Sequence, residues 1–324
     1  MLYKRVMKSM VWVVTTTVCM GWYTPLFGQT QYATPDTAYV RAVEQAFSFL
    51  KQGDCRSCLR AYQRAFTISQ KSALSTLRAA ACAYQCGRTK QAQTYLQQAA
   101  SLDFWISEDV WEKPQEAPEL NSLRNSSLTT AFQQYLDEQK IAEGRNPALE
   151  RELKRIFTED QLPRLRMDTI MRQYGANSPQ AQPVWAQMRR ADSVNLPKVE
   201  RIIAQYGYPG KRLVGEKQNE TAWLVIQHAS LMVQEKYLPL LQEAAAQGQL
   251  AKASVALTVD RIRVNKGQKQ LYGSQVKNGY NGKPAGFWAI EDEVNVDKRR
   301  AEVGLPPLAT YAKYYGFEYK LPGN

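Results

Sequence analysis

A 34-residue spacing in the first half of the chain limits its fold more than any other sequence feature. Residues of similar size or role recur at this distance five times between positions 53 and 102. The pairs are Gly53 with Gly87, Cys58 with Ala92, Tyr62 with Leu96, Ala65 with Ala99, and Ile68 with Leu102. Such a period, with glycine at the turn and small residues where helices cross, is typical of stacked helical hairpins. It predicts two repeats of helix, turn and helix.

This pattern resembles the tetratricopeptide repeat over about residues 39–106. The second copy shows it best, although Thr76, Ala79 and Ala80 stand where that family has its Trp-Leu-Gly signature. The resemblance implies a small concave face that binds a protein or peptide. We expect Phe47, Leu77 and Tyr84 to contribute to this face.

Two repeats are fewer than the three or so that such arrays usually need to bury a continuous face. A third apolar helical pattern runs from Leu128 to Ile141. We expect this helix to pack on the repeats as a cap. The segment between, residues 103–126, is rich in Trp, Pro and acidic residues, and we expect an irregular connection there.

Four cysteines lie on the predicted repeats, at positions 55, 58, 82 and 86. Spacings of three and four residues put each pair on one face of a helix. In the resembling fold the two helices pack antiparallel, which implies disulfides Cys55–Cys86 and Cys58–Cys82. Such bridges would stabilise a short repeat array in an oxidising compartment. A zinc ion held by four thiolates is the alternative.

Residues 1–28 have the features of a secretory signal peptide. Three basic residues precede an apolar stretch from Met10 to Met20, which Thr15–Thr17 interrupts. This stretch is short for a transmembrane helix. We therefore expect an exported protein, periplasmic or extracellular, with no membrane span after cleavage. An uncleaved membrane anchor is the alternative.

Charge divides the rest of the chain. Residues 29–149 carry a net charge of +1, and residues 150–324 carry +8 of the chain's +12. Gly144, Asn146 and Pro147 predict a helix stop between these parts. We expect a repeat domain over 29–145 and a second domain over 146–324. Acidic residues intersperse the basic ones throughout the second domain, which argues against a nucleic-acid partner.

The second domain is expected to be mostly helical, with one small β-hairpin. Helical periodicity covers residues 149–157, 159–174, 181–193, 196–206, 219–233, 235–247 and 249–265. Strands over Leu271–Val276 and Ala285–Ile290 would flank a loop with two Asn-Gly pairs. Two short helices, at about 295–303 and 307–315, would end the chain. The expected fold class is therefore mainly α.

Four short motifs resemble those of an uncharacterised domain found in exported and other bacterial proteins, over about residues 148–318. They are Gln227-His228-Ala229, Asp260-Arg261, Gln270-Leu271-Tyr272-Gly273-Ser274-Gln275 and Val303-Gly304-Leu305. The similarity includes Asp160-Gln161 and Tyr206-Gly207-Tyr208-Pro209. Ser274 replaces the usual threonine and keeps its hydroxyl group. The resemblance implies a domain boundary but no activity.

His228 is the only histidine in the chain, so it is the side chain best suited to proton transfer near neutral pH. Asp260 could orient its ring, and Arg261 could hold a carboxylate or phosphate group through two parallel hydrogen bonds. The expected ligand-binding residues are His228, Asp260, Arg261, Gln270, Tyr272 and Gln275. We expect no metal ion and no cofactor.

Three functions stay open at this point. The first is binding, with the repeats taking a protein or peptide and the second domain a small polar or anionic ligand. The second is a hydrolase or lyase with His228 as base and Asp260 as its orienting group. The third is a structural scaffold, because a histidine among the apolar residues 223–231 is commonly part of a core. No Walker, dinucleotide-binding or Gly-x-Ser-x-Gly motif occurs in the chain.

Overall fold

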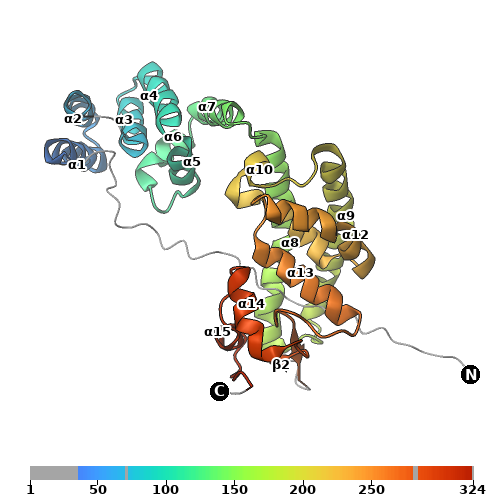
Figure 1. Ribbon diagram of the computed structural model, residues 1–324. Helices are drawn as coiled ribbons and strands as arrows, with labels where there is room; N and C mark the ends of the chain where they lie inside the picture. Colours follow the sequence, from blue (N-terminus) through green and yellow to red (C-terminus); the bar gives the residue numbers. More distant parts are fainter. Residues whose placement is uncertain (1–35, 70–71, 280–283, 323–324) are drawn as a thin grey trace, which may run out of the picture. The chain divides into compact units, whose positions relative to one another are not determined.

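The computed structural model describes residues 36–69, 72–279 and 284–322 (Figure 1). The expected signal peptide lies outside these residues. The described chain is mainly helical and has one small antiparallel sheet, which confirms the expected fold class. None of the described helices is both long and apolar enough to cross a membrane. The chain divides near residue 147 into two compact units, here the N-terminal and the C-terminal unit.

The N-terminal unit begins with two helical hairpins. Helix α1 (Thr37–Gln52) packs against α2 (Cys55–Ile68), and α3 (Ala73–Gln85) packs against α4 (Thr89–Leu102) (Figure 1). Helices α2 and α4 begin 34 residues apart. Gly53 and Gly87, each in the left-handed backbone region, follow the first helix of their hairpins. The repeat-like helical organisation predicted from the spacing is therefore confirmed.

The repeated positions explain the packing of these hairpins. Six of them are completely buried: Cys58, Tyr62, Ala65, Ala92, Leu96 and Ala99. The last pair of the pattern, Ile68 and Leu102, is about two-fifths exposed. The period thus marks the small and large side chains that fit where the helices cross, as close-packed interiors require.

The expected concave face is partly wrong, because Leu77 is completely buried. It lies on α3, the helix that contacts both α2 and α4 and is therefore covered from several sides. Phe47 is partly buried, and the charged groups of Lys51 and Arg78 lie over its ring. Arg78 also donates a hydrogen bond of 2.7 Å to Glu119.

The segment expected to be irregular contains helices, so that expectation is wrong. It forms α5 (Phe104–Glu112), the 3₁₀ helix η2 (Pro118–Leu120) and α6 (Asn121–Arg124). The Asp103 side chain caps α5 by accepting the N–H of Ile106. Arg124 stabilises the connection between α5 and η2 by donating hydrogen bonds to the backbone carbonyls of residues 110, 111 and 117. Helix α7 (Leu128–Ala142) then packs against α4.

The four cysteines lie in two close pairs at the junction of the hairpins. The Cα atoms of Cys55 and Cys86 are 5.5 Å apart, and those of Cys58 and Cys82 are 6.0 Å apart. Both separations fit disulfide bonds. The pairs are those implied by the resemblance to tetratricopeptide repeats, and they join α2 to the helix that follows it.

Two long helices begin the C-terminal unit, α8 (Pro147–Tyr174) and α9 (Ala181–Tyr206). Each joins two helices that the sequence analysis had separated, and each contains a proline, Pro163 or Pro197. A proline removes one backbone hydrogen bond. Apolar side chains on both sides of each proline are buried in the core, which keeps the helix continuous.

Four helices follow, of which the first was not predicted. They are α10 (Lys211–Gln218), α11 (Thr221–His228), α12 (Leu231–Ala246) and α13 (Lys252–Asn265). Helix α11 contacts α9 and α12. Helix α12 also contacts α13 (Figure 1). The buried side chains of Trp223 and Leu241 lie at the centre of this packing, where the Trp223 ring donates a hydrogen bond of 2.9 Å to the buried Thr258. The expected single helix over 219–233 is instead interrupted at residues 229–230.

The chain ends with the sheet and three short helices. Strands β1 (Val276–Asn278) and β2 (Pro284–Phe287) are antiparallel, with Val276 opposite Phe287. The first is much shorter than expected, because residues 271–275 form an irregular turn around Asp260. The elements η3 (Glu293–Asn295), α14 (Val296–Glu302) and α15 (Leu308–Tyr314) follow.

We expect Cys58→Ala combined with Cys82→Ala to lower the free energy of unfolding of the N-terminal unit by about 3 kcal/mol, because the bridge restricts the unfolded chain. Urea unfolding with and without reductant measures this. Alkylation under non-reducing conditions, followed by mass measurement, should find none of the four thiols free. Four alkylated thiols and one bound zinc ion per chain would support the zinc alternative.

Candidate functional site

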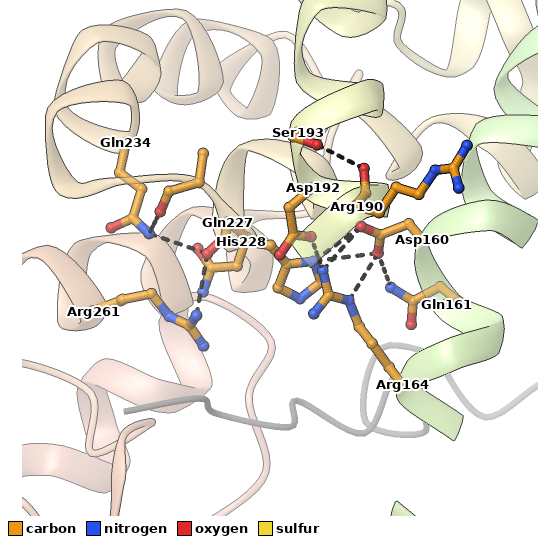
Figure 2. A network of polar contacts seen from close by, with 11 residues as sticks. Asp160, Gln161, Arg164, Arg190, Asp192, Ser193, Gln227, His228, Gln234 and Arg261 are labelled. Atoms are coloured by element: carbon orange, nitrogen blue, oxygen red, sulfur yellow. Dashed lines mark hydrogen bonds and ion pairs between the residues drawn. The ribbon is translucent and has the colours of Figure 1, made fainter. Parts of the chain in front are cut away.

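The imidazole of His228 contacts a carboxylate that the sequence analysis did not place in the site. His228 is the last residue of α11, and its side chain is only 4% exposed. Its Nδ1 lies 3.3 Å from Oδ1 and 3.2 Å from Oδ2 of Asp160, on α8 (Figure 2). A hydrogen bond to a carboxylate requires a proton on Nδ1. The neutral ring therefore has its lone pair on Nε2.

Arg164 lies one helical turn beyond Asp160 and binds the same carboxylate (Figure 2). Its Nε is 3.2 Å from Oδ2 and its Nη2 is 3.1 Å from Oδ1, a side-on contact through two parallel donors. The Nη2 group also donates to Asp192, on α9. Gln161 donates a further hydrogen bond of 2.5 Å to Asp160. This cluster therefore connects α8, α9 and α11.

The pKa values in this cluster differ with the surroundings of each group. Burial disfavours the ionised form of Asp160, but His228 and Arg164 more than offset this and hold its pKa well below the usual range. Burial lowers the pKa of His228, and the charges of Arg164 and Arg261 add to this effect although Asp160 opposes it. Burial raises the pKa of Asp192. At neutral pH the site thus has an ionised Asp160 beside a neutral imidazole.

Arg261 is a buried cation that binds only a backbone oxygen. It lies on α13 and is 8% exposed, and its Nη1 donates a hydrogen bond of 3.1 Å to the carbonyl of Gln227. Within the described ranges its Nε and Nη2 have no hydrogen-bond partner, and no acidic side chain forms an ion pair with it. Burial lowers its pKa to about 10. These two free donors form the same edge with which Arg164 binds Asp160.

The free polar atoms are enclosed in this structure. Solvent reaches neither Nε2 of His228, which has no partner in the described part of the chain, nor the free donors of Arg261. The most exposed side chain of the cluster is Asp192, at 32%.

A second polar network surrounds Asp260, which is completely buried. Its carboxylate accepts backbone N–H groups from Leu271, Tyr272 and Ser274, at distances between 2.6 and 3.2 Å. Gly273, within this turn, has φ +67°, and a Cβ there would lie 2.8 Å from a methyl carbon of Leu308. Asp260 thus holds an irregular turn that glycine alone can complete.

Gln270, Gln275 and Tyr272 belong to this second network. The Gln270 amide donates to the carbonyls of Gln275 and Trp288 and accepts the N–H of Gln275. The Tyr272 carbonyl accepts a hydrogen bond of 2.6 Å from Arg300. These hydrogen bonds connect residues 270–275 to Trp288, directly after β2, and to α14. They therefore hold the fold of this region.

The six expected site residues fall into two groups. Arg261 binds the carbonyl of Gln227, the residue before His228, and its charge lowers the pKa of His228. Asp260, Gln270, Tyr272 and Gln275 form the turn network instead, and none of them makes a hydrogen bond with His228. The expected pairing of His228 with Asp260 is therefore wrong. Asp260 is the sequence neighbour of Arg261, but its carboxylate accepts hydrogen bonds from the backbone N–H groups of Leu271, Tyr272 and Ser274 instead of binding His228.

One group of side chains has the donor atoms of a metal site. Asp160, Asp192 and His228 each offer one atom, and these atoms lie within 4.8 Å of one another. The guanidinium of Arg164 donates to both carboxylates, so a cation there would meet its positive charge. Unpaired donors on Arg261 make the surroundings better suited to an anion.

Residues 147–322 match a family of unknown function, DUF6624. The chain belongs to this family. The DUF6624 region contains every residue of the two polar networks, from Asp160 to Arg300. No curated protein and no solved structure matches the chain.

The sequence held a partial indication of the residues that were missed. Asp160 and Arg164 are four residues apart, a spacing that places them on one face of a helix, and Asp160-Gln161 is part of the resemblance described above. Asp192 has no such indication. It reaches the cluster only because α9 passes beside α8 in the fold.

We expect the stability of the protein to fall as the pH falls below about 6.5, the ordinary histidine value. Because burial lowers the pKa of His228 in the folded state, the unfolded chain takes up its proton at a higher pH. This slope should be smaller in His228→Asn, since the chain has one histidine.

Urea unfolding between about pH 7.5 and 5.5 measures this slope. Carboxylates with raised pKa, such as Asp192 and Glu220, act in the opposite direction. They remain in both proteins, so the difference between the two slopes belongs to His228. Equal slopes would contradict the prediction.

Proposed function

We propose that the C-terminal unit binds a small anionic ligand at Arg261 and His228. The observation that carries this proposal is the free edge of Arg261. A buried arginine ordinarily has a carboxylate partner, because removing its charge from water is costly. Arg261 has only one backbone carbonyl, and its Nε and Nη2 have no partner among the described residues.

The chemistry of this edge indicates the class of ligand. Nε and Nη2 of a guanidinium donate in parallel and match two oxygens of a carboxylate or a phosphate. Within the protein, Arg164 already binds the carboxylate of Asp160 through its Nε and Nη2 in this way. Nε2 of neutral His228 accepts a hydrogen bond, so it favours a ligand with a hydroxyl or other donor near its anionic group.

Arg261→Lys tests this proposal, because lysine keeps the positive charge but lacks the two parallel donors. We expect the affinity for acetate or inorganic phosphate to fall about tenfold or more, as the loss of a charge-assisted hydrogen bond implies. Isothermal titration calorimetry measures the affinity.

Arg166→Lys is the matched control. Arg166 is an exposed residue of α8, and its replacement should leave binding unchanged. Equal affinities in all three proteins, or binding of neither probe to the wild type, would support the scaffold alternative. In that case Arg261 would only fasten the end of α11.

An enzyme that transfers a proton is the second candidate, and Asp160 takes the place first given to Asp260. The favouring observation is that Nδ1 of His228 binds Asp160 while Nε2 is buried without a partner in the described chain. A carboxylate that fixes the ring in this way prepares Nε2 to act as a base. A hydrolase or a lyase could use such a group.

We expect the single histidine to carry its proton on Nδ1 at pH 7.5. In Asp160→Asn the amide can accept that proton through its oxygen or donate to Nδ1 instead, so both tautomers become accessible. The ¹⁵N spectrum of protein labelled in the imidazole ring distinguishes them. A wild-type ring with its proton on Nε2 would argue against this candidate.

We propose further that the protein is exported to the periplasm or the extracellular space, and that the N-terminal unit binds a protein or a peptide. The two cysteine pairs at disulfide distance support an oxidising compartment. The two helical hairpins support the second part, because stacked hairpins commonly present an extended binding surface. The face around Phe47 and Tyr84 is partly buried rather than fully open.

A further inference from the structure

We propose that Asp192 is a built-in occupant of the anion site, and that an oxyanion bound at Arg261 displaces the Asp192 carboxylate from Arg164. This inference rests on the proposed function and adds the manner of binding. It makes Arg164 a second contact of the ligand. Asp192 would determine how tightly the site binds.

The two carboxylates on Arg164 are held unequally. Asp160 is 1% exposed and receives both donors of the side-on edge, a further bond from Gln161 and the contact with His228. Asp192 is 32% exposed and receives a single nitrogen of Arg164. Arg164 is the only hydrogen-bond partner that the described residues offer to Asp192. Asp192 is therefore the carboxylate that can leave.

Removal of Asp192 would not leave Arg164 unpaired. The side-on contact with Asp160 keeps two of its donors occupied. The Nη2 group that now serves two carboxylates would turn its second hydrogen to the ligand. The Asp192 carboxylate would move into solvent, which its exposure on α9 allows.

The charges of the two arginines act on each other and on the same imidazole. The charge of Arg164 lowers the pKa of Arg261, and both charges lower the pKa of His228. Figure 2 shows the ring of His228 beside the guanidinium of Arg164, with Arg261 at the other side of Gln227. In the proposed arrangement the oxyanion bridges the arginines near His228, whose buried Nε2 has no partner among the described residues.

The charge of the cluster favours an exchange of one anion for another. Asp160 and Asp192 balance Arg164 and Arg261 when the imidazole is neutral. With Asp192 moved into solvent, the cluster has one excess positive charge, which a single oxyanion neutralises. A ligand added beside Asp192 would instead give an excess of negative charge in a buried place.

Asp192→Asn tests the inference, because the amide keeps the size of the side chain but holds Arg164 less firmly. We expect the affinity for acetate and for inorganic phosphate to rise about two- to fivefold, the range for a partly exposed ion pair. Calorimetric titration of the full chain gives the affinity for each probe. The probe with the larger gain identifies a carboxylate or a phosphate as the better ligand.

Glu200→Gln is the matched control on the same helix. Glu200 pairs with Lys236 and Tyr237, outside the cluster, so its replacement should leave both affinities unchanged. A thermal unfolding curve for each variant confirms that it is folded. The ring ¹⁵N signals of His228 should shift on addition of the bound probe.

The outcomes separate this inference from the proposed function. If Arg261→Lys abolishes binding while Asp192→Asn binds no better than the wild type, the anion site stands and the displacement of Asp192 is wrong. If no probe binds to the wild type or to Asp192→Asn, both fail. A rise in affinity in Glu200→Gln equal to that in Asp192→Asn would also overturn the inference, because it would reflect overall charge.

Discussion

The ionised carboxylate of Asp160 is the group on which the polar cluster depends. It accepts hydrogen bonds from Gln161, Arg164 and His228, and so connects α8 to the end of α11. Without it, a buried guanidinium would lose its main partner, and the imidazole would lose the contact that fixes its proton. Breaking a buried pair by removing one partner commonly costs 3–5 kcal/mol. Asp160 is therefore both a fold determinant and the organiser of the site.

Most of the helical framework could be predicted because it follows from local patterns. The 34-residue spacing located both hairpins, since it marks side chains that must fit between helices. The two long helices were expected to break at residue 158 and at residues 194–195. Buried apolar side chains on both sides of these positions keep α8 and α9 continuous, and Pro163 and Pro197 lie inside them. Residues 271–275 were assigned to a strand, but backbone hydrogen bonds to Asp260, eleven or more positions earlier, determine their shape.

Only part of the candidate site could be predicted from the sequence, because its residues lie far apart along the chain. Arg261 and His228 occur in short motifs and were found, although their expected partner, Asp260, is turned away. Asp160 lies 68 residues before His228, and Arg164 lies 28 residues before Asp192. No local pattern connects positions so far apart. Their contacts arise from the packing of α8, α9 and α11, and no local sequence pattern predicts how these helices pack.

Arg261 also ends a helix, and this has a consequence for how the family can diverge. The Gln227 carbonyl, in the last turn of α11, is held by Arg261 and Gln234 together. On the proposed function, a relative that bound no ligand would still need Arg261 to complete α11, so selection for folding alone would preserve this arginine. Asp192 does not complete a helix in this way, because its hydrogen bond is with the side chain of Arg164. The proposal therefore places the differences between binding and non-binding relatives at Asp192, with Arg261 the same in both.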